Sequence, residues 1–412
     1  RARSLSVSQL LQRIDDRFRL LTLPRVEAND ADGERHAALE RVVDMSYELC
    51  TSGEQGLWAR LSVFAQPFDL PTAEAVCAGN GLAADEIVDL VSGLVEKSVL
   101  TVEAAAPSTN GNVRYVLLDT LRDYGARKLD VTGETVSIRD RHRRHYQGRL
   151  AAAANAWPGP EDFETLTALC RELPDVLAAV QASLAQFDYH TAQALVRDLV
   201  RVRLPFYWGF FLDLISHELG KVIESARPSS AVSTNAAVDL AATLSTAAWV
   251  SAAQGHNDAA RALLAEAYAL HAQTGTAPSA VVLFADGASM TLSRGTPDAI
   301  DLLARARSMY PRHSGDWHTA SMMHALAVVF TADPREVMRA AKEYLREALN
   351  TRTPWAASWA TWIISMAALR SGDAENARDW INQCLSLQRG LRDRWGHALS
   401  VELAGEIAAE LL

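Results

Sequence analysis

A repeat in the C-terminal part of the chain restricts the possible folds more than any other feature. Four turn-forming residues, Gly255, Gly295, Asp333 and Gly372, are separated by 40, 38 and 39 residues. Each one lies between two amphipathic segments and is followed five residues later by an apolar residue. A unit that recurs at such a period buries its apolar face only against the neighbouring copies. The segment 231–412 is therefore predicted to form an α-solenoid of paired helices.

The spacing of apolar residues within the repeat indicates helices. Leu240, Leu244 and Ala248 lie on one stripe before the first turn, and Ala260 and Leu264 lie on the next stripe. The period exceeds the usual tetratricopeptide unit of about 34 residues, and the sequence fingerprint of that unit is poor here. The period and the helix–turn–helix pattern predict a solenoid of tetratricopeptide-like hairpins with longer helices.

Residues 35–130 follow a different pattern. Helical segments at 35–50, 53–64, 71–77 and 85–97 are followed by two short β-branched segments, 98–103 and 113–118, that are separated by turn-forming residues. This pattern predicts a β-hairpin. Asp119 is then expected to cap a helix, because its carboxylate can accept hydrogen bonds from the first-turn N–H groups. Helices, a hairpin and a final helix together predict a winged-helix domain.

The predicted fold class is mostly α, with little β structure outside the hairpin. An amphipathic helix over 5–21 and a polar loop occupy the first segment, and helices without strand signals continue after the winged helix. The predicted domains are 1–34, 35–130 (winged helix), 131–230 (helical connector) and 231–412 (solenoid).

Composition excludes several classes of protein. Hydrophobic residues make up 49% of the 412 residues and charged residues 22%, which excludes a disordered chain. The four cysteines are far apart, so neither a disulfide framework nor a zinc ribbon is expected. No uninterrupted apolar run approaches the roughly 18 residues of a membrane span, and we expect a cytoplasmic protein without membrane partners. The chain lacks an initiator Met, from which we expect it to be part of a longer protein.

Charge argues against DNA binding by the winged helix. The whole chain has 40 basic and 50 acidic residues, for a net charge of −10. Residues 35–130 contain 8 Lys or Arg and 14 Asp or Glu, a net charge of 8 − 14 = −6. Neutralisation of phosphates supplies most of the affinity of nonspecific DNA binding. Direct DNA binding by this chain is therefore the less favoured interpretation.

Several motifs of the N-terminal third occur in an order known from one class of regulators. They are RHAALERVVDMSYEL (35–49), LSVFA (61–65), LVEKSVL (94–100) and YVLLDTLRDYG (115–125). This region resembles the segment that follows the nucleotide-binding core of bacterial STAND-class (NB-ARC-like) ATPases, the large transcription regulators of the LuxR and SARP types. RFRLLT (17–22) resembles the end of the helical lid before that segment. Beyond about residue 150 the resemblance is one of architecture.

The resemblance implies a switch driven by nucleotide exchange, in which helical repeats sense a signal and the winged helix relays it. ATP or ADP and Mg²⁺ would be held by the core, which this chain does not contain. No phosphate-binding GxxxxGK[ST] loop occurs, because none of the four lysines has the required neighbours. We expect no catalytic residues, cofactor or metal site, and no enzyme activity from this chain.

The sequence departs from the resembled class at the triplet by which the winged helix would contact the nucleotide. Eukaryotic relatives have a Met-His-Asp triplet whose histidine contacts ADP, and the corresponding triplet here is Leu117-Leu118-Asp119. Leucine cannot hydrogen-bond a phosphate. Arg114, Asp119 and Arg122 are the nearest polar candidates for an interdomain or nucleotide relay. The favoured alternative is that Asp119 is only a helix cap.

Clusters of aromatic residues in the connector and solenoid are candidates for an effector or partner groove. Trp355, Trp359 and Trp362 recur at spacings of four and three and so share one helical face. The other candidates are Tyr207, Trp208 and Trp317. Concave solenoid surfaces commonly bind ligands. The favoured alternative is packing between helices, as is usual for large aromatic residues.

A basic cluster between residues 139 and 149 consists of five arginines and two histidines: Arg139, Arg141, Arg143, Arg144, Arg149, His142 and His145. A solvated helix face is the favoured interpretation. A contact with phosphate or with acidic residues of another domain is a second possibility, and a metal site is a third.

The sequence thus favours a non-catalytic regulatory and sensing arm of a STAND-type regulator. The solenoid would bind an effector, either a small molecule or a protein, and the winged helix would contact the nucleotide-binding core of the same parent chain. Two alternatives remain open: a freestanding tetratricopeptide-like scaffold for protein–protein interaction, and a DNA-binding winged-helix protein.

Overall fold

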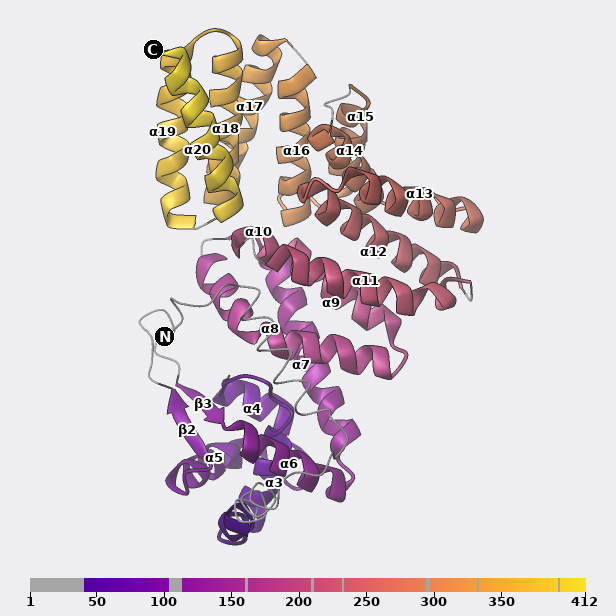
Figure 1. The fold of residues 1–412 in the computed structure, drawn as a ribbon, viewed down its shortest axis with the longest axis vertical. Coiled ribbons are helices and arrows are strands. Elements are labelled where there is room, and N and C mark those ends of the chain that lie inside the picture. Colours follow the sequence, from indigo (N-terminus) through magenta and orange to yellow (C-terminus); the bar gives the residue numbers. More distant parts are fainter. Residues whose placement is uncertain are drawn as a thin grey trace, which may run out of the picture.

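The structure is a computed structural model, and its elements are labelled in Figure 1. It describes residues 41–103, 113–159, 162–208, 211–231, 233–293, 297–331, 333–391 and 393–412, without the side chains of Phe163, Trp208, Thr331 and Pro334. The predicted helix at 5–21, the segment 1–34, the tip of the hairpin and the Gly295 turn lie outside these residues. Figure 1 shows the winged-helix elements at one end of the molecule and the C-terminal helices at the other end.

The predicted winged helix is confirmed. Residues 41–48 are helical, and they are followed by a compact set of helices around a small sheet. The helices are α3 (Ser52–Leu61), α4 (Leu70–Cys77), the 3-10 turn η2 (Ala84–Glu86), α5 (Ile87–Glu96) and α6 (Asp119–Thr132). Trp58 is completely buried between α3 and α6, and its indole nitrogen donates to the Leu121 carbonyl at 2.9 Å. This contact holds α6, the final helix of the domain, against α3.

The sheet has three strands, one more than the sequence indicates. β2 (Leu100–Glu103) and β3 (Arg114–Leu117) form the expected antiparallel hairpin, with Leu100 opposite Leu117. β1 (Phe68–Asp69) pairs with the other edge of β3, which gives the order β1-β3-β2. Two residues are too few for an alternating pattern, so only the pairing with β3 identifies β1 as a strand.

The expected role of Asp119 as helix cap is wrong. Leu118 occupies the N-cap position of α6 and supplies no side-chain hydrogen bond. Asp119 is the first helical residue, and its carboxylate lies 3.0 Å from the Arg122 guanidinium. The extended backbone of Leu118 continues from β3, and this shifts the helix start by one residue relative to the expectation.

Helices also form the connector between the winged helix and the solenoid. They are α7 (Thr135–Ala156), α8 (Asp162–Ala185), α9 (Tyr189–Arg201), α10 (Leu204–Trp208) and α11 (Phe211–Ser230). α7 packs against α4 of the winged helix and also against α8 and α9. The connector therefore contacts both ends of the molecule.

The solenoid of tetratricopeptide-like hairpins is also confirmed. Gly255 and Gly372 adopt φ of +81° and +76° between two helices, a conformation that favours glycine, and Asp333 caps the second helix of its pair. The helices are α12 (Thr234–Ala253), α13 (Asn257–Thr274), α14 (Ala280–Ser293), α15 (Pro297–Met309), α16 (Gly315–Thr331), α17 (Pro334–Asn350), α18 (Pro354–Arg370), α19 (Ala374–Leu391) and α20 (Arg394–Glu410).

The first helix of each pair is the more buried one. α12 and α18 are buried around most of their circumference and include buried Ser and Thr residues, whereas α17 buries one stripe that includes Val337, Ala341 and Tyr344. The solenoid helices curve around the short helix α10 (Figure 1). α10 contacts α8, α9, α11 and α20. The solenoid therefore turns back onto the connector, so that its last helix meets α10.

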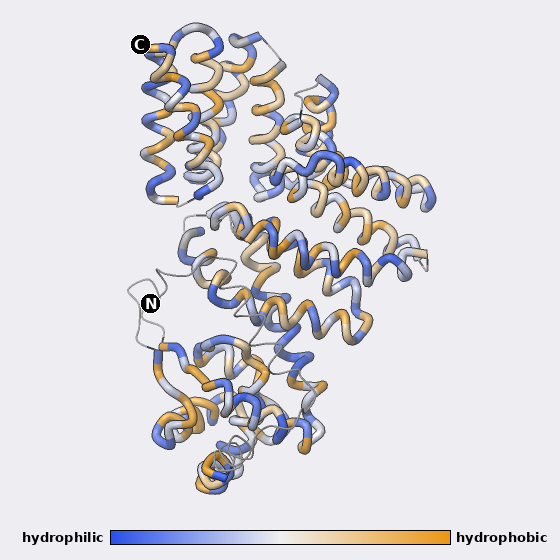
Figure 2. Tube along the Cα trace, viewed as in Figure 1, coloured by the Kyte–Doolittle hydropathy of each residue, from blue (hydrophilic) through white to orange (hydrophobic). Residues whose placement is uncertain are grey.

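α12 illustrates how deep the interior is. By length and composition it is apolar enough to cross a bilayer, with a mean hydropathy of 1.3 over an 18-residue window, and Figure 2 shows its mostly apolar course. However, 72% of that window is buried inside the protein. Ser and Thr residues interrupt α12, so its sequence contains no long uninterrupted apolar run. Its burial identifies it as a core helix of the solenoid.

We expect Gly287→Ala to destabilise the solenoid. A Cβ at Gly287 in α14 would lie 2.7 Å from Leu303 Cγ and 3.1 Å from the Ala299 carbonyl oxygen of α15. Such overpacking costs about 1–3 kcal/mol. The matched control is Gly405→Ala in α20, where no atom lies within 4 Å of the added Cβ. The control gains roughly 0.5–1 kcal/mol from helix propensity. Thermal unfolding followed by circular dichroism measures both, and equal melting temperatures would contradict the described packing of α14 on α15.

Candidate functional site

A buried arginine marks the centre of the inner side of the solenoid. Arg203 lies between α9 and α10 with φ of +65°, a strained conformation for a residue with a side chain, and is 2% exposed. Its guanidinium carbon lies near the centroids of four aromatic rings, at 4.0 Å from Phe206, 5.3 Å from Trp355, 5.7 Å from Trp395 and 5.9 Å from Trp249. A cation near aromatic faces is attracted by their quadrupoles. The contacts join α10 with α12, α18 and α20.

The described residues leave the hydrogen-bonding capacity of Arg203 unused. Among the described residues, no group accepts a hydrogen bond from its Nε, Nη1 or Nη2 atoms. A buried donor without an acceptor costs about 1–3 kcal/mol, and more when it is charged. Burial lowers the pKa of Arg203 to about 10, although nearby Asp393 opposes the shift. The side chain therefore remains a cation at neutral pH.

Asp393 is the acidic neighbour of Arg203, and its own hydrogen bonds are made elsewhere. It caps α20 by accepting from the Gly396 amide at 3.0 Å, and it accepts from the Trp355 indole at 3.1 Å. Burial raises the pKa of Asp393, while the Gly396 hydrogen bond and the charge of Arg203 oppose that shift. Asp393 thus ties α18 to α20 and leaves the donors of Arg203 unpaired.

A cavity of about 50 Å³ lies beside Arg203, between α9, α12, α14 and α16. This exceeds the roughly 10–15 Å³ that a water molecule requires. Its charged residues other than Arg203 are already paired, because Asp316 bonds Arg201 at 3.0 Å. The remaining lining combines apolar and hydroxyl side chains: Val200, Thr246, Trp249, Val281, Phe284, Tyr310 and Thr319.

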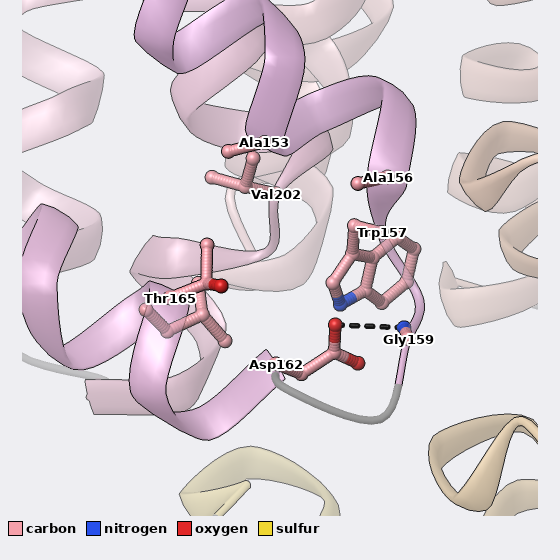
Figure 3. A pocket seen from close by; sticks show the side chains of 8 residues that line it. Ala153, Ala156, Trp157, Gly159, Asp162, Thr165 and Val202 are labelled. Atoms are coloured by element: carbon pink, nitrogen blue, oxygen red, sulfur yellow. Dashed lines mark hydrogen bonds between the residues drawn. The ribbon is translucent and has the colours of Figure 1, made fainter. Parts of the chain in front are cut away.

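A second cavity, of about 180 Å³, lies at the end of α7 (Figure 3). Trp157 and Asp162 lie side by side on one wall, and Thr165 and Val202 lie across from them. Asp162 Oδ1 accepts from the Gly159 amide at 2.7 Å, whereas Oδ2 has no partner among the described residues. Burial raises the pKa of Asp162 to about 7.

The two cavities belong to one buried region. Tyr207 of α10 is buried close to Asp393 and Asp162. Burial, and then the charges of Asp393 and Asp162, raise the pKa of Tyr207 well above the usual value. The rings of Trp157 and Trp355 meet edge to face with centroids 4.8 Å apart. The end of α7 therefore touches the aromatic group around Arg203.

The structure places the sequence-predicted aromatic candidates in different settings. Tyr207, Trp355, Trp359 and Trp362 are buried between helices, as the packing alternative expects. Tyr207 and Trp355 nevertheless lie in the region of Arg203, whereas the indole of Trp362 bonds the Leu399 carbonyl away from it. The Trp208 side chain lies outside the described part of the structure. Trp317 lines a separate cavity of about 540 Å³ between α15, α16 and α17.

The predicted relay residues gather at one loop of the winged helix. Arg114 donates to the Pro67 carbonyl, and Arg122 donates to the Ala65 carbonyl at 3.3 Å and pairs with Asp119. Asp119 and Arg122 line a cavity of about 270 Å³ beside this loop, and Arg114 is not part of its lining. The structure thus brings the three residues to the same loop.

That loop is bonded directly to the connector. The buried Asp175 of α8 accepts from the Ala65 amide at 2.7 Å and lies 3.1 Å from His142 Nε2 of α7. Nearby, the buried Arg60 of α3 pairs with Glu134 at 2.8 Å, immediately before α7 begins. Two buried polar contacts therefore fasten the start of α7 to the winged helix.

The basic cluster is divided between solvent and internal pairs. Arg139, Arg144 and Arg149 are exposed, as the favoured interpretation expects, whereas His142 and Arg143 are buried. Arg143 pairs with Asp140 and Asp188, and Arg149 pairs with Glu172 of α8. These acidic partners belong to the connector itself and not to another domain. Within the described residues, no group of three potential metal ligands occurs.

Several residues of the buried region were missed by sequence reasoning. Arg203, Asp162 and Asp393 are far apart in the chain, and none belongs to a motif. One signal was available for Arg203, which immediately precedes the apolar run beginning at Leu204. A charged residue next to such a run is a candidate for burial.

The chain is similar to known proteins over part of its length. No protein-family model matches the chain. Proteins of Mycobacterium tuberculosis and Mycobacterium bovis named "Putative HTH-type transcriptional regulator" are 34% identical over 211 residues, which is 51% of this chain and 22% of theirs. Uncharacterized proteins of the same two species are 32% identical over 146 residues, 35% of this chain and 35% of theirs. The chain spans well under half of the length of these relatives.

Among solved structures, the chain is similar to a STAND protein with a tetratricopeptide repeat sensor from Pyrococcus horikoshii. The TM-score is 0.51 with 13% sequence identity, over 89% of this chain and 48% of that one. At this identity the likeness concerns the fold. The chain is thus a helical-repeat protein with the architecture of a known repeat sensor, and part of its sequence is similar to that of a mycobacterial protein named as a regulator.

We expect the stability of the chain to depend on Asp162 between about pH 4 and pH 7. The folded pKa of Asp162 is about 7, against 3.8 for an unperturbed group. The folded state therefore keeps a proton that the unfolded state releases, so stability falls as pH rises through this window. At pH 8 the free energy of unfolding of Asp162→Asn should exceed that of the unmodified chain by an amount of order 1–4 kcal/mol, which appears as a higher melting temperature. The difference should be smaller at pH 5.

Thermal unfolding of both proteins at the two pH values measures the effect. The exposed Asp258→Asn is the control, since Asp258 lies on the surface of α13. A difference between Asp162→Asn and the unmodified chain that is the same at both pH values would contradict the protonated state of Asp162.

Proposed function

We propose that this chain is the sensing and relay arm of a STAND-type, ATP-dependent transcriptional regulator. The solenoid binds an effector on its inner side, near Arg203. The winged helix transmits the change to a nucleotide-binding core through the loop at residues 65–67. The motif order of the N-terminal third, the partial relatives and the repeat-sensor architecture support this proposal.

One observation carries the relay part of the proposal: α7 touches both candidate sites. Its 22 residues span about 33 Å. At its start lie the Arg60–Glu134 pair and the His142–Asp175 contact with the Ala65 loop. At its end, the C-cap residue Trp157 packs on Trp355 of α18. A rigid helix held at both ends converts a displacement at one end into a displacement at the other.

A ligand changes such a system only if it binds one arrangement better than the other. The contacts between α10, α18 and α20 join parts of the chain that are distant in sequence, so they are the contacts that an opening of the solenoid would break. An effector inserted beside Arg203 would alter the spacing of these helices and hence the position of Trp157. In this proposal the core senses that displacement through the winged helix.

The chain itself is proposed to be non-catalytic and cytoplasmic. ATP or ADP and Mg²⁺ would bind to the core, because this sequence has no phosphate-binding loop motif. Purified chain should hydrolyse ATP no faster than buffer. Turnover that survives repeated purification would contradict this part of the proposal.

DNA binding by the winged helix is the weaker alternative. The helix at the usual recognition position, with η2 before it, carries Asp85, Glu86, Asp89 and Glu96. Four acids repel phosphates at the groove. A gel shift at low salt should detect no complex, whereas a complex whose affinity falls steeply with added salt would favour the alternative. A freestanding scaffold differs from the proposed arm by having no core to couple to.

We expect Gly315→Ala to disturb the relay from its solenoid end. A Cβ at Gly315 would lie 2.4 Å from Trp157 Cε3 and 2.7 Å from the Trp157 carbonyl oxygen, so Trp157 must move. The matched control on α7 itself is Gly148→Ala, where no atom lies within 4 Å of the new Cβ. Hydrogen exchange measured by mass spectrometry should rise in α7 and around Ala65 in the first variant and stay unchanged in the second.

The outcome distinguishes a relay from a passive linker. If exchange rises only around residue 315 and remains unchanged around Ala65, then α7 does not couple the two ends. In that case the sensing arm would need another route to the winged helix, and the relay described above would be wrong.

A further inference from the structure

We propose that the cavity beside Arg203 binds a small organic acid, whose carboxylate pairs with the Arg203 guanidinium while its apolar body lies against Trp249 and Phe284. This inference rests on the proposed function, because it names the chemical class of the effector. It follows from three properties of the cavity: an unpaired cationic donor, apolar walls and a small volume.

The donor is the strongest of these properties. Arg203 is 2% exposed, and within the described chain none of its three nitrogens has an acceptor. A guanidinium presents its N–H groups in a planar fork that matches the two oxygens of a carboxylate. The other arginine of the lining, Arg201, already bonds Asp316 and Asp198. Arg203 alone has its donors available.

The neighbouring acid does not compete for these donors. Asp393 accepts from the Gly396 amide and the Trp355 indole, and its remaining interaction with Arg203 is through space. A ligand carboxylate would therefore satisfy Arg203 without displacing an existing hydrogen bond. An uncharged ligand would leave the buried cation uncompensated, and a cationic ligand would be repelled by it.

The walls and the volume limit the rest of the ligand. Trp249, Phe284 and Val281 present apolar surface, and Thr246 and Thr319 add hydroxyl groups. The cavity of about 50 Å³ is a third of the roughly 150 Å³ that accepts benzene, so it suits a carboxylate with a short aliphatic body of one to three carbons. Its lining comes from α9, α12, α14 and α16, so a ligand in the cavity would contact helices of both the connector and the solenoid. These contacts would couple occupancy of the cavity to the arrangement of the solenoid.

The competing interpretation is that Arg203 only holds the aromatic rings together. The two interpretations differ in the response to carboxylates. Methionine fills irregular apolar space, but it loses the attraction to the rings and leaves Asp393 without its cationic neighbour, so Arg203→Met should melt lower under either interpretation. If Arg203 also serves a ligand, carboxylates stabilise the unmodified chain and do not stabilise Arg203→Met. If Arg203 is purely structural, no carboxylate affects the unmodified chain.

The experiment is a thermal-shift titration of the full 412-residue chain with acetate, propionate and butyrate, followed by calorimetry of any that respond. Acetamide, propionamide and butyramide are the uncharged ligand controls of similar shape. We expect at least one carboxylate to raise the melting temperature and the uncharged compounds to have no effect. A ligand at 100 times its Kd should stabilise by about 2.7 kcal/mol.

Three variants locate the response. Arg203→Met should abolish it, and Arg203→Lys should weaken binding at least tenfold, because lysine keeps the charge and loses the fork. The control Arg261→Met changes an exposed arginine of α13 and should respond like the unmodified chain. If Arg203→Met does not fold, Arg203→Lys and the uncharged compounds still test the proposal.

Several results would overturn the inference. They are equal responses to the acids and to their uncharged analogues, a response that persists in Arg203→Met, and no response of the unmodified chain to any of the acids at millimolar concentration. Binding of methyl phosphate without binding of any carboxylate would also overturn it. None of these results decides the proposed sensing function, which the exchange experiment with Gly315→Ala tests separately.

Discussion

The arrangement of the whole C-terminal part depends on the contact between Arg203 and the rings around it. The guanidinium lies between side chains of α10, α12, α18 and α20, so one group of residues joins the connector to the first and last helices of the solenoid. An attraction between a cation and aromatic faces becomes stronger when both are removed from water. Within the described residues the same burial leaves the N–H donors of Arg203 without acceptors. A cation that holds four rings together and still has free donors distinguishes this site from an ordinary hydrophobic core.

The second organising element is α7. Buried polar contacts at its start and an aromatic contact at its end make it part of both the winged helix and the solenoid interior. Removing one partner of such a buried pair strongly destabilises a protein. The pairs therefore keep α7 and its neighbours together when one of them moves. The cavities at Arg203, at Asp162 and at the 65–67 loop lie near the two ends of α7. A ligand or partner bound there would contact residues that hold α7 in position.

Much of the fold could be predicted because it is local in origin. The period of apolar residues specified the solenoid helices, and the change to short β-branched segments specified the hairpin. Prediction was less accurate where a neighbour in space decides the outcome. β1 is a strand only through its pairing with β3, and Leu118 displaces Asp119 from the cap because β3 continues extended to that point. For the tryptophans of α18, the sequence left packing and a ligand groove both open, since a stripe of large apolar residues suits either.

By itself, the sequence determined that this protein is a winged helix followed by stacked helix pairs, because the hydrophobic period and the turn residues act over a few neighbouring positions. It also determined the acidity of the winged helix, which depends on composition alone. Only the tertiary structure decided where the functional candidates lie. Arg203 and Asp393 acquire their burial and their shifted pKa values from helices more than a hundred residues apart in the chain, and the cavity beside Asp162 combines residues from 153 to 202. Desolvation and the lack or presence of a hydrogen-bond partner are properties of the surrounding space, and no local pattern of residues encodes them.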